Sequence, residues 1–299
     1  FMSTQDFDDE IGEGLRLIGE LAEYAKNQKR EECDVSELVV GLKCGGSDGF
    51  SGLTANPLIG RFSDKLISKG GSTVLTEVPE MFGAETILMN RCVNEEVFDK
   101  TVSLINDFKD YFTSHNQVVY ENPSPGNKKG GITTLEDKSL GCVQKSGSAD
   151  VEDVIEIGGS VTRKGLNLLT GPGNDIVAVT NLTASGCHLI LFSTGRGTPV
   201  GAPVPTVKIA TNTNLAKRKP HWIDFNAGEI INGADLTDEL FEYVYNAIMN
   251  NIGKVQKYDP WYDQNVYTSI VESGIPILER MCAVLDSVQQ GKMIDLMIQ

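Results

Sequence analysis

The sequence lacks an apolar run long enough to cross a membrane. Its longest apolar stretches, within "GCHLILFSTG" and "ETILMN", fall far short of the ~20 residues that a membrane-spanning helix needs. The first residues, "FMSTQDFDDE", are acidic rather than typical of a secretion signal. We therefore expect a soluble, cytoplasmic protein that does not bind membranes.

Basic residues are also scarce. The chain has 26 Lys and Arg residues against 41 Asp and Glu residues, which gives a formal net charge of −15 at pH 7. Such a charge repels phosphate backbones, so a basic surface could exist only as a local patch. We expect no nucleic-acid partner. At 299 residues, the chain is long enough for a sizeable core and lies near the length at which one domain gives way to two.

The six cysteines form no C-x-x-C pair and show no short zinc-ribbon spacing, which argues against a structural zinc site. In a cytosolic chain, such cysteines are usually reduced, small and buried. We predict this state for Cys33, Cys92, Cys142, Cys187 and Cys282. Cys44 differs from them because it stands among glycines in the stretch "GLKCGGSDGFSG".

Nucleotide-binding and serine-hydrolase motifs are missing as well. The stretch "GNKKGGIT" lacks the spacing of a P-loop, no G-x-G-x-x-G opens a helix after the first predicted strand, and no G-x-S-x-G elbow is present. The three histidines have no partner at a meaningful spacing, so we interpret His115, His188 and His221 as structural or solvated residues. A histidine-based mechanism within this chain is therefore disfavoured.

The sequence does contain an alternation of strand and helix patterns. Residues 36–43 predict a buried strand, residues 54–71 a helix, and residues 72–78 a second strand, which implies a right-handed crossover and a parallel pair. We predict an open, Rossmann-like α/β fold with a mixed, mostly parallel sheet and helices on both faces. The remaining patterns predict helices over 79–91, 94–116, 135–147 and 235–254, a loop and helix over 165–186, and strands within 187–201 and 206–211.

The chain also shows signs of three segments. An amphipathic helix is predicted over about residues 10–30, where Ile11, Leu15 and Ile18 share one face. We divide the chain into a helical segment at 1–38, a main α/β domain at 39–250, and a helical tail at 251–299 to which we assign no function. The first helix is expected to pack on the main domain.

Three polar, glycine-rich loops follow predicted strands: "CGGSDGFSG", "EVPE" and "TGRGTPVG". Ligands of α/β sheets bind outside the carboxyl ends of the strands, so these loops are expected to border one site. Cations held by glycine-rich turns suit the carboxylates of a small polar substrate such as a polyhydroxy acid. The alternative for any one loop is a tight turn with solvated charges. The residues that stand out are Ser47, Asp48, Ser51, Lys128, Lys129 and Arg196.

Six stretches of the chain resemble, in this order, the altronate and galactarate dehydratase family between about Val39 and Gly233. The resemblance implies a hydro-lyase that removes water from a sugar acid to give a 2-keto-3-deoxy acid, with Fe²⁺ or another divalent metal as helper. The stretches are "GLKCGGSDGFSGLTANPLIG", "EVPEMFGAETILMNRCVNEEVF", "NPSPGNKKGGITTLEDKSLGCVQKSG", "FSTGRGTPVG", "PTVKIAT" and "DFNAGEI".

The resemblance leaves alternatives open. The large subunit of a sulfolactate sulfo-lyase is similar in the same motifs, and a catalytically incomplete domain that binds sugar acids or assembles with a separate subunit is a further alternative. Family members carry a small N-terminal β-domain and a middle domain before these motifs, whereas here the helix at 10–30 resembles only the end of the middle domain. The chain therefore looks like a truncated or split member, for which a separate small N-terminal-type domain or subunit is a candidate partner. Homo-oligomer formation stays open.

The expected chemistry assigns roles to the loop residues. Such a reaction needs a base for the proton next to a carboxylate, cations or a metal to hold the enediolate, and an acid for the departing hydroxyl. We predict that Lys128 or Lys129 is the base or the stabilising cation, only one facing the site because neighbours on an extended segment point apart. Arg196 is predicted to clamp a carboxylate.

Cys44 and Asp48 offer a soft and a hard metal ligand, unless Cys44 only fills a gap beneath the loop. Further catalytic candidates are Asp48 and Ser51, and further substrate-binding candidates are Ser47, Asn127, Gly195 and Thr198.

Overall fold

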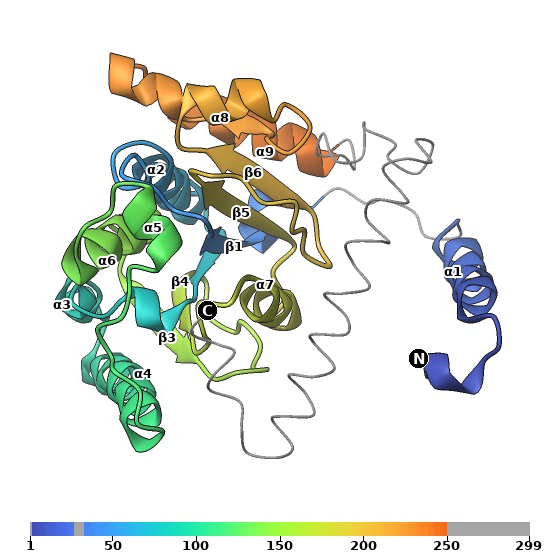
Figure 1. Cartoon of the computed structure of the whole chain (residues 1–299), viewed down its shortest axis with the longest axis horizontal. Coiled ribbons are helices and arrows are strands. Elements are labelled where there is room, and N and C mark those ends of the chain that lie inside the picture. The colour runs from blue at the N-terminus through green and yellow to red at the C-terminus, as the bar shows by residue number, and fades with distance from the viewer. Residues whose placement is uncertain (1, 27–32, 250–299) are drawn as a thin grey trace. The chain divides into compact units, whose positions relative to one another are not determined.

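The computed structural model describes residues 2–26 and 33–249 (Figure 1). The chain divides into two compact units, Phe1–Asp34 and Val35–Gln299. The predicted tail at 251–299 lies outside the described residues.

The first unit consists of a short 3-10 turn, Thr4–Asp6, and helix α1, Glu10–Lys26. Acidic residues open α1 and a lysine closes it, which complements the helix dipole. Arg16 forms ion pairs with Glu13 and Glu20, one helical turn away on either side. The packing of this helix on the main domain stays a prediction. Its apolar stripe is exposed at Ile11, Leu15, Ile18, Leu21 and Tyr24.

The second unit is built on a seven-stranded sheet in the order β3-β4-β2-β1-β5-β6-β7. Every neighbouring pair is parallel, which confirms the predicted open α/β sheet; among the described strands, none is antiparallel. The strands are β1 Val39–Cys44, β2 Ser72–Leu75, β3 Val151–Ile155, β4 Gly165–Leu169, β5 Leu189–Thr194, β6 Thr206–Ala210 and β7 Phe225–Asn226.

Helices cover both faces of the sheet, and several begin at an Asn or Thr cap whose side chain accepts an N–H three residues on. No helix in the two described ranges is long and apolar enough to cross a membrane. The helices are α2 Ala55–Ser68, α3 Glu85–Met89, α4 Glu95–Ser114, α5 Pro125–Lys129, α6 Leu135–Val143, α7 Asp175–Ala184, α8 Thr213–Arg218 and α9 Thr237–Met249. Short 3-10 turns are η2 Val35–Glu37, η3 Val78–Glu80, η4 Gln144–Ser146 and η5 Gly228–Asn232.

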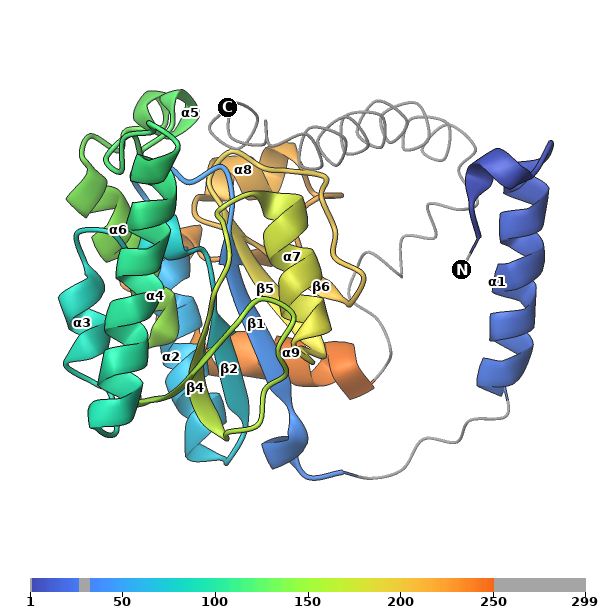
Figure 2. The ribbon, with the colours of Figure 1, turned by 90° about the horizontal axis from the view of Figure 1, so that it is seen from below.

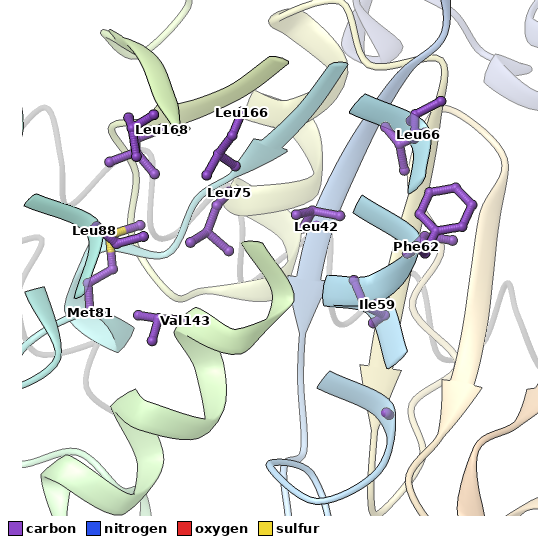
Figure 3. Close-up of a cluster of buried hydrophobic side chains, with 14 of the residues drawn as sticks. Leu42, Ile59, Phe62, Leu66, Leu75, Met81, Leu88, Val143, Leu166 and Leu168 are labelled. Atoms are coloured by element: carbon purple, nitrogen blue, oxygen red, sulfur yellow. The ribbon is translucent and has the colours of Figure 1, made fainter. Parts of the chain in front are cut away.

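The core explains the strand patterns. On β5, Leu189 and Leu191 join the larger apolar cluster with α2, whereas Ile190 and Phe192 join a smaller cluster with α7. Figure 2 shows α7 on one face of the sheet and α2 and α9 on the other, and Figure 3 shows side chains of α2 and neighbouring strands meeting in the larger cluster. Because both faces are covered, the central strands read as continuous apolar runs.

Two sequence expectations were wrong. The start of 165–186, expected as a loop, is the fully buried strand β4; short apolar runs of this kind do not reveal their structure by periodicity. The helix expected over 79–91 is split into η3 and α3, and Gly83, with φ 88°, lies between them. Strands β3 and β7 were not predicted either.

Because all strands run in parallel, their carboxyl ends share one edge of the sheet. From β1 the chain crosses to β2 on one side, and it returns later to β5 on the other side of β1. The ends of β1 and β5 therefore form the switch point at which open α/β sheets bind their ligands. Cys44 is the last residue of β1.

Candidate functional site

The first glycine loop leaves β1 at Cys44 and is tied to the loop after β5. The carbonyl of Gly46 accepts the N–H groups of Gly195 and Arg196, each at 3.1 Å. A Cβ at Gly195 would lie 2.1 Å from the carboxyl carbon of Asp48, so only glycine permits this approach. The glycines thus join two loops into one wall at the switch point.

Three ligand-type side chains meet beside this wall. The Sγ atoms of Cys44 and Cys142 are 3.5 Å apart, and Cys142 Sγ lies 3.1 Å from a carboxylate oxygen of Glu80. One donor atom from each of the three residues lies within 4.8 Å of the other two. Two sulfurs and a carboxylate are a donor set suited to Fe²⁺, Co²⁺ or Zn²⁺ rather than to Mg²⁺ or Ca²⁺. These residues could therefore hold a transition metal.

Two buried lysines accompany the donors. Lys145 Nζ lies 3.0 Å from Cys44 Sγ, and Lys138 Nζ lies 3.0 Å from Cys142 Sγ. Lys138 also forms an ion pair with Glu80. Burial alone disfavours a charged lysine, but the surrounding sulfurs and carboxylates outweigh burial and raise the pKa of Lys138 well above its usual value. Both lysines are therefore ammonium groups that can stabilise negative charge.

The pKa values of the two thiols are shifted in opposite directions. The hydrogen bond from Cys142, together with the nearby lysines, lowers the pKa of Cys44 well below its usual value despite burial. The same hydrogen bond and burial raise the pKa of Cys142. Hydrogen bonding and charge therefore favour the thiolate form at Cys44 over the thiolate form at Cys142.

Further buried charged side chains lie next to Cys44, those of Lys43 and Glu77. Lys43, fully buried, forms ion pairs with Glu77 and, at 2.8 Å, with Asp175. Glu77 accepts the N–H of Cys44 at 3.0 Å and lies 3.5 Å from Lys145. Glu77 has left-handed backbone angles, φ 71° and ψ 60°, which are uncommon for a residue other than glycine and mark functional sites. Burial, followed by the charge of Cys44, raises the pKa of Glu77 to about 7.

The donor group opens onto a cavity of about 700 Å³. Cys44, Glu80 and Lys138 contribute to its wall, as do Asp175 and Arg196. The wall also has an aromatic part, formed by Phe108, Tyr111 and Phe112. The cavity therefore combines a polar, charged region with an apolar region, as small-molecule sites do.

The structure brings four of the predicted site residues to this cavity: Cys44, Ser47, Asn127 and Arg196. Asn127 donates to the Ser47 carbonyl at 3.0 Å, and Arg196 donates to the Gly126 carbonyl at 2.7 Å. Cys44 has a sulfur, a carboxylate and two ammonium groups around it.

The other predicted residues lie elsewhere. Lys128 and Lys129 are exposed at the end of α5, in a helical rather than extended segment, and neither is among the described residues that line the cavity. The Asp48 carboxylate accepts from Thr211 at 2.8 Å and from Asn212 at 3.0 Å, outside the Cys44 donor group. Ser51 and Gly195 contact Asp48, and Thr198 accepts the N–H of Val200 at 3.2 Å through its hydroxyl.

Sequence reasoning missed most of the charged cluster. It identified the loop "EVPE" but gave no role to Glu77 or Glu80. Lys138 and Cys142 are four residues apart and Lys145 follows three later, a spacing that places all three on one helical face. That spacing was the available signal.

The cysteine predictions had mixed outcomes. Cys142 and Cys187 are free and buried, as predicted. Cys33 is exposed and Cys92 only half-buried, so burial was wrong for the first and incomplete for the second. Cys33 lies just before the second unit, where no core surrounds it. Cys282 lies outside the described residues.

The sequence profile of the family D-galactarate/Altronate dehydratase, C-terminal matches residues 35–268. The chain is 66% identical over 228 residues to a protein named altronate dehydratase from Bacillus subtilis (strain 168), covering 76% of this chain and 46% of the relative. It is 39% identical over 237 residues to the galactarate dehydratase (L-threo-forming) of Escherichia coli (strain K12), covering 79% of this chain and 45% of the relative.

A more distant relative is named (2R)-sulfolactate sulfo-lyase subunit beta, from Chromohalobacter salexigens. It is 33% identical over 240 residues, which cover 78% of this chain and 62% of the relative. The chain thus spans about half the length of the two dehydratases that it matches.

Proposed function

Because the chain belongs to the D-galactarate/altronate dehydratase family, we propose that it carries the active site of a hydro-lyase that removes water from a sugar acid. The product would be a 2-keto-3-deoxy acid. The observation that carries this proposal is the group of Cys44, Glu80, Cys142 and Lys138 beside a cavity at the switch point of the sheet. The higher identity to the altronate enzyme favours altronate over galactarate as the substrate.

The charged residues fit the demands of this reaction. Arg196 borders the cavity and its guanidinium is anchored on the Gly126 carbonyl, which suits it to hold the substrate carboxylate. Lys138, kept as an ammonium by its surroundings, offers positive charge for the enediolate that forms when the neighbouring proton leaves. A buried ammonium stabilises this charge more strongly than an exposed one, because water does not screen it.

Asp175 is our candidate for the proton acceptor. Its carboxylate borders the cavity and is oriented by Lys43, and it does not belong to the donor group of two sulfurs and Glu80. A positioned carboxylate within reach of the substrate is a sufficient general base when the developing charge is stabilised nearby. Lys128 and Lys129, expected to serve as base from the sequence, remain the rivals of Asp175 in the assays below.

We place a divalent metal, Fe²⁺ by preference, on Cys44, Cys142 and Glu80. The donor chemistry fits, since all three ligand atoms converge and two are sulfurs. When bound, a divalent ion would supply Lewis-acid stabilisation of negatively charged oxygen. Lys138 and Lys145 now contact the sulfurs and would have to give way to the ion.

Metal binding can be tested apart from turnover. Chelator-treated protein is titrated with Co²⁺, and the sulfur-to-cobalt charge-transfer absorption is recorded. We expect this band to be clearly weaker in Cys142→Ser, which removes one of the two sulfur ligands, and unchanged in Cys187→Ser, a change at a buried cysteine of the smaller core. An unchanged band in Cys142→Ser would exclude Cys142 as a ligand.

The function itself is tested with a substrate panel. The purified chain with Fe²⁺ is incubated with altronate, galactarate and sulfolactate, alone and with a separate protein that corresponds to the part of the relatives it does not cover. Release of keto acid from a sugar acid supports the proposal, and release that needs the added protein shows that turnover requires the part of the relatives that this chain does not cover. Binding of sugar acids without turnover under every condition would instead indicate a binding or assembly domain.

A sulfo-lyase is the second candidate, favoured by the relative named (2R)-sulfolactate sulfo-lyase subunit beta. It would use the same proton abstraction with sulfite as the leaving group. Release of sulfite from sulfolactate, without keto acid from either sugar acid, would establish it in place of the dehydratase.

A further inference from the structure

The two sulfurs of the donor group are close enough to react with each other. Cys44 at the end of β1 and Cys142 on α6 are 98 residues apart in the sequence, yet their Sγ atoms are 3.5 Å apart. A disulfide brings sulfurs to ~2.05 Å, so the two sulfurs would have to approach each other by about 1.5 Å. We infer that Cys44 and Cys142 form a redox-active dithiol that hydrogen peroxide converts into an intramolecular disulfide.

Other cysteines of the described residues lack such a partner sulfur. Cys187 lies 3.8 Å from the hydroxyl of Ser185, and Cys92 lies 3.4 Å from that of Thr101. In the ranges 2–26 and 33–249, Cys44 and Cys142 are the one pair whose sulfurs are in contact. The chemistry is therefore specific to this pair.

An oxidant can approach the pair through the cavities. Cys44 lines the cavity of about 700 Å³, and Cys142 lines a second, smaller cavity of about 250 Å³. Lys145 and Lys138 each place an ammonium group 3.0 Å from one of the sulfurs. Each sulfur therefore has a cavity from which peroxide can reach it and an ammonium group beside it.

The oxidation proceeds in two balanced steps. The Cys44 sulfur attacks one oxygen of hydrogen peroxide, the O–O bond breaks, and the leaving hydroxide takes up a proton to become water, which leaves a sulfenic acid on Cys44. The Cys142 sulfur then attacks the Cys44 sulfur, the S–O bond breaks, and the hydroxide leaves as water with the Cys142 proton. The two sulfurs give two electrons to the peroxide, and a dithiol reductant such as dithiothreitol returns them.

In the disulfide, neither Cys44 nor Cys142 could bind a metal as a thiolate. Its consequence for turnover rests on the proposed function: an oxidised chain would bind no metal at this group and would be inactive until reduced. A bound metal would in turn occupy the sulfurs and slow their oxidation. The pair would thus link the activity of the site to the oxidant level around the protein.

The test uses the full chain, treated with a chelator and then with one equivalent of hydrogen peroxide. After alkylation of the remaining thiols, intact mass and peptide mapping are recorded. We expect the loss of two hydrogen atoms, a linked peptide pair that contains Cys44 and Cys142, and full reversal by dithiothreitol. Cys187→Ser should behave like the unchanged protein. In Cys142→Ser the sulfenic acid of Cys44 should persist and be trapped by dimedone, a reagent for sulfenic acids.

Two results would overturn the inference. One is oxidation of Cys44 to a sulfinic acid in the unchanged protein while Cys142 is still alkylated; the other is a disulfide from Cys44 to a different cysteine. Neither depends on catalysis. If the Cys44–Cys142 disulfide forms but the reduced protein, supplied with Fe²⁺ and assayed with and without the added partner protein, yields no keto acid from any sugar acid, the dithiol stands and the dehydratase proposal fails.

Discussion

Two sets of cations were considered for the candidate site, one from the sequence and one from the structure, and they differ in burial. The buried set, Lys43, Lys138 and Lys145, is almost fully removed from water, and each member has a carboxylate or sulfur partner. The exposed set, Lys128, Lys129 and Arg196, lies at the surface of glycine-rich loops and α5. A buried charge is stable only when it is paired in one particular place, whereas an exposed charge is solvated almost anywhere. Buried charges therefore locate the chemistry more specifically.

The largest loss of stability is expected from a change at Lys43, the lysine of the buried set that pairs with two carboxylates. Replacing Lys43 by methionine removes the nearer of the two lysines that pair with the buried Glu77, leaving Lys145 at 3.5 Å, and weakens the hold on Asp175. We expect Lys43→Met to lower the free energy of unfolding by about 3–5 kcal/mol. The matched change Lys128→Met, at an exposed lysine, should alter it by less than about 0.5 kcal/mol. Urea denaturation of both variants provides the measurement.

Equal unfolding free energies in Lys43→Met and Lys128→Met would contradict the expectation that the buried lysine contributes more to stability than the exposed one. They would mean that Glu77 finds another cation when Lys43 is absent, and Lys145, at 3.5 Å, is the neighbour positioned to serve. The double variant Lys43→Met with Lys145→Met would then show the loss that the single change conceals.

Asp175 can be compared with Lys128 and Lys129 as the base by the effect of each substitution on kcat. If Asp175 accepts the proton, Asp175→Asn should lower kcat by about 100-fold or more, with a smaller change in KM. Lys128→Ala and Lys129→Ala should stay near the unchanged rate, because both lysines are exposed and outside the cavity wall. The assay is keto-acid release from altronate with any partner protein that proves necessary. A large loss of kcat in one lysine variant alone would restore the exposed set as the source of the base.

A smaller effect is expected from Arg196, the one exposed cation among the described residues that borders the cavity. Arg196→Ala should raise KM about tenfold, since it removes a charged contact worth roughly 1.5 kcal/mol, and it should change kcat less. Arg196→Lys should restore part of the binding because the charge returns without the bidentate fork. Initial rates over a range of substrate concentrations separate the two constants. An unchanged KM in Arg196→Ala would place the carboxylate elsewhere in the cavity.

The sequence predicted the loop residues of the site better than its buried charged residues. The parallel sheet and its active edge could be predicted, because β1 and β5 are buried runs followed by glycine loops and because ligands bind at the ends of such strands. Cys44 and Arg196 were found for this reason, since they stand in those loops. The strand β4 was missed because "GLNLL" carries no period that separates a strand from a buried helix or loop.

The buried cluster could not be predicted because its members come from separate parts of the chain. Glu77 follows β2, Lys43 lies on β1 and Lys145 lies in η4, and only the folded chain brings them together. A lysine in a strand or helix pattern is ordinarily read as solvent-exposed, so its burial is invisible in composition. The spacing from Lys138 to Lys145 was the one local sign.

The smallest predicted effect concerns the pH dependence of stability and isolates Glu77. The groups that face it are Lys43 on β1, Lys145 in η4, Cys44 at the end of β1 and Glu80 in the same turn. Burial and the charge of Cys44 raise its pKa to about 7 from an ordinary value of 4.5, and the lysines only partly oppose this. The folded protein therefore holds the Glu77 proton more tightly than the unfolded chain does. The stabilisation that results is complete below the unfolded pKa and is lost as the pH rises through about 7.

Glu77→Gln removes this titration while keeping the size of the side chain. The difference in unfolding free energy between the unchanged protein and Glu77→Gln should fall as the pH rises from about 5 to about 7, by less than about 1.4 kcal/mol per pH unit, the limit for one proton. Cys44→Ser should weaken the same trend, because it removes the negative charge that helps to raise the pKa of Glu77. Urea denaturation at several pH values measures all three proteins. A difference that grows with pH would show that Lys43 and Lys145 dominate over burial, and that Glu77 is a carboxylate throughout this range.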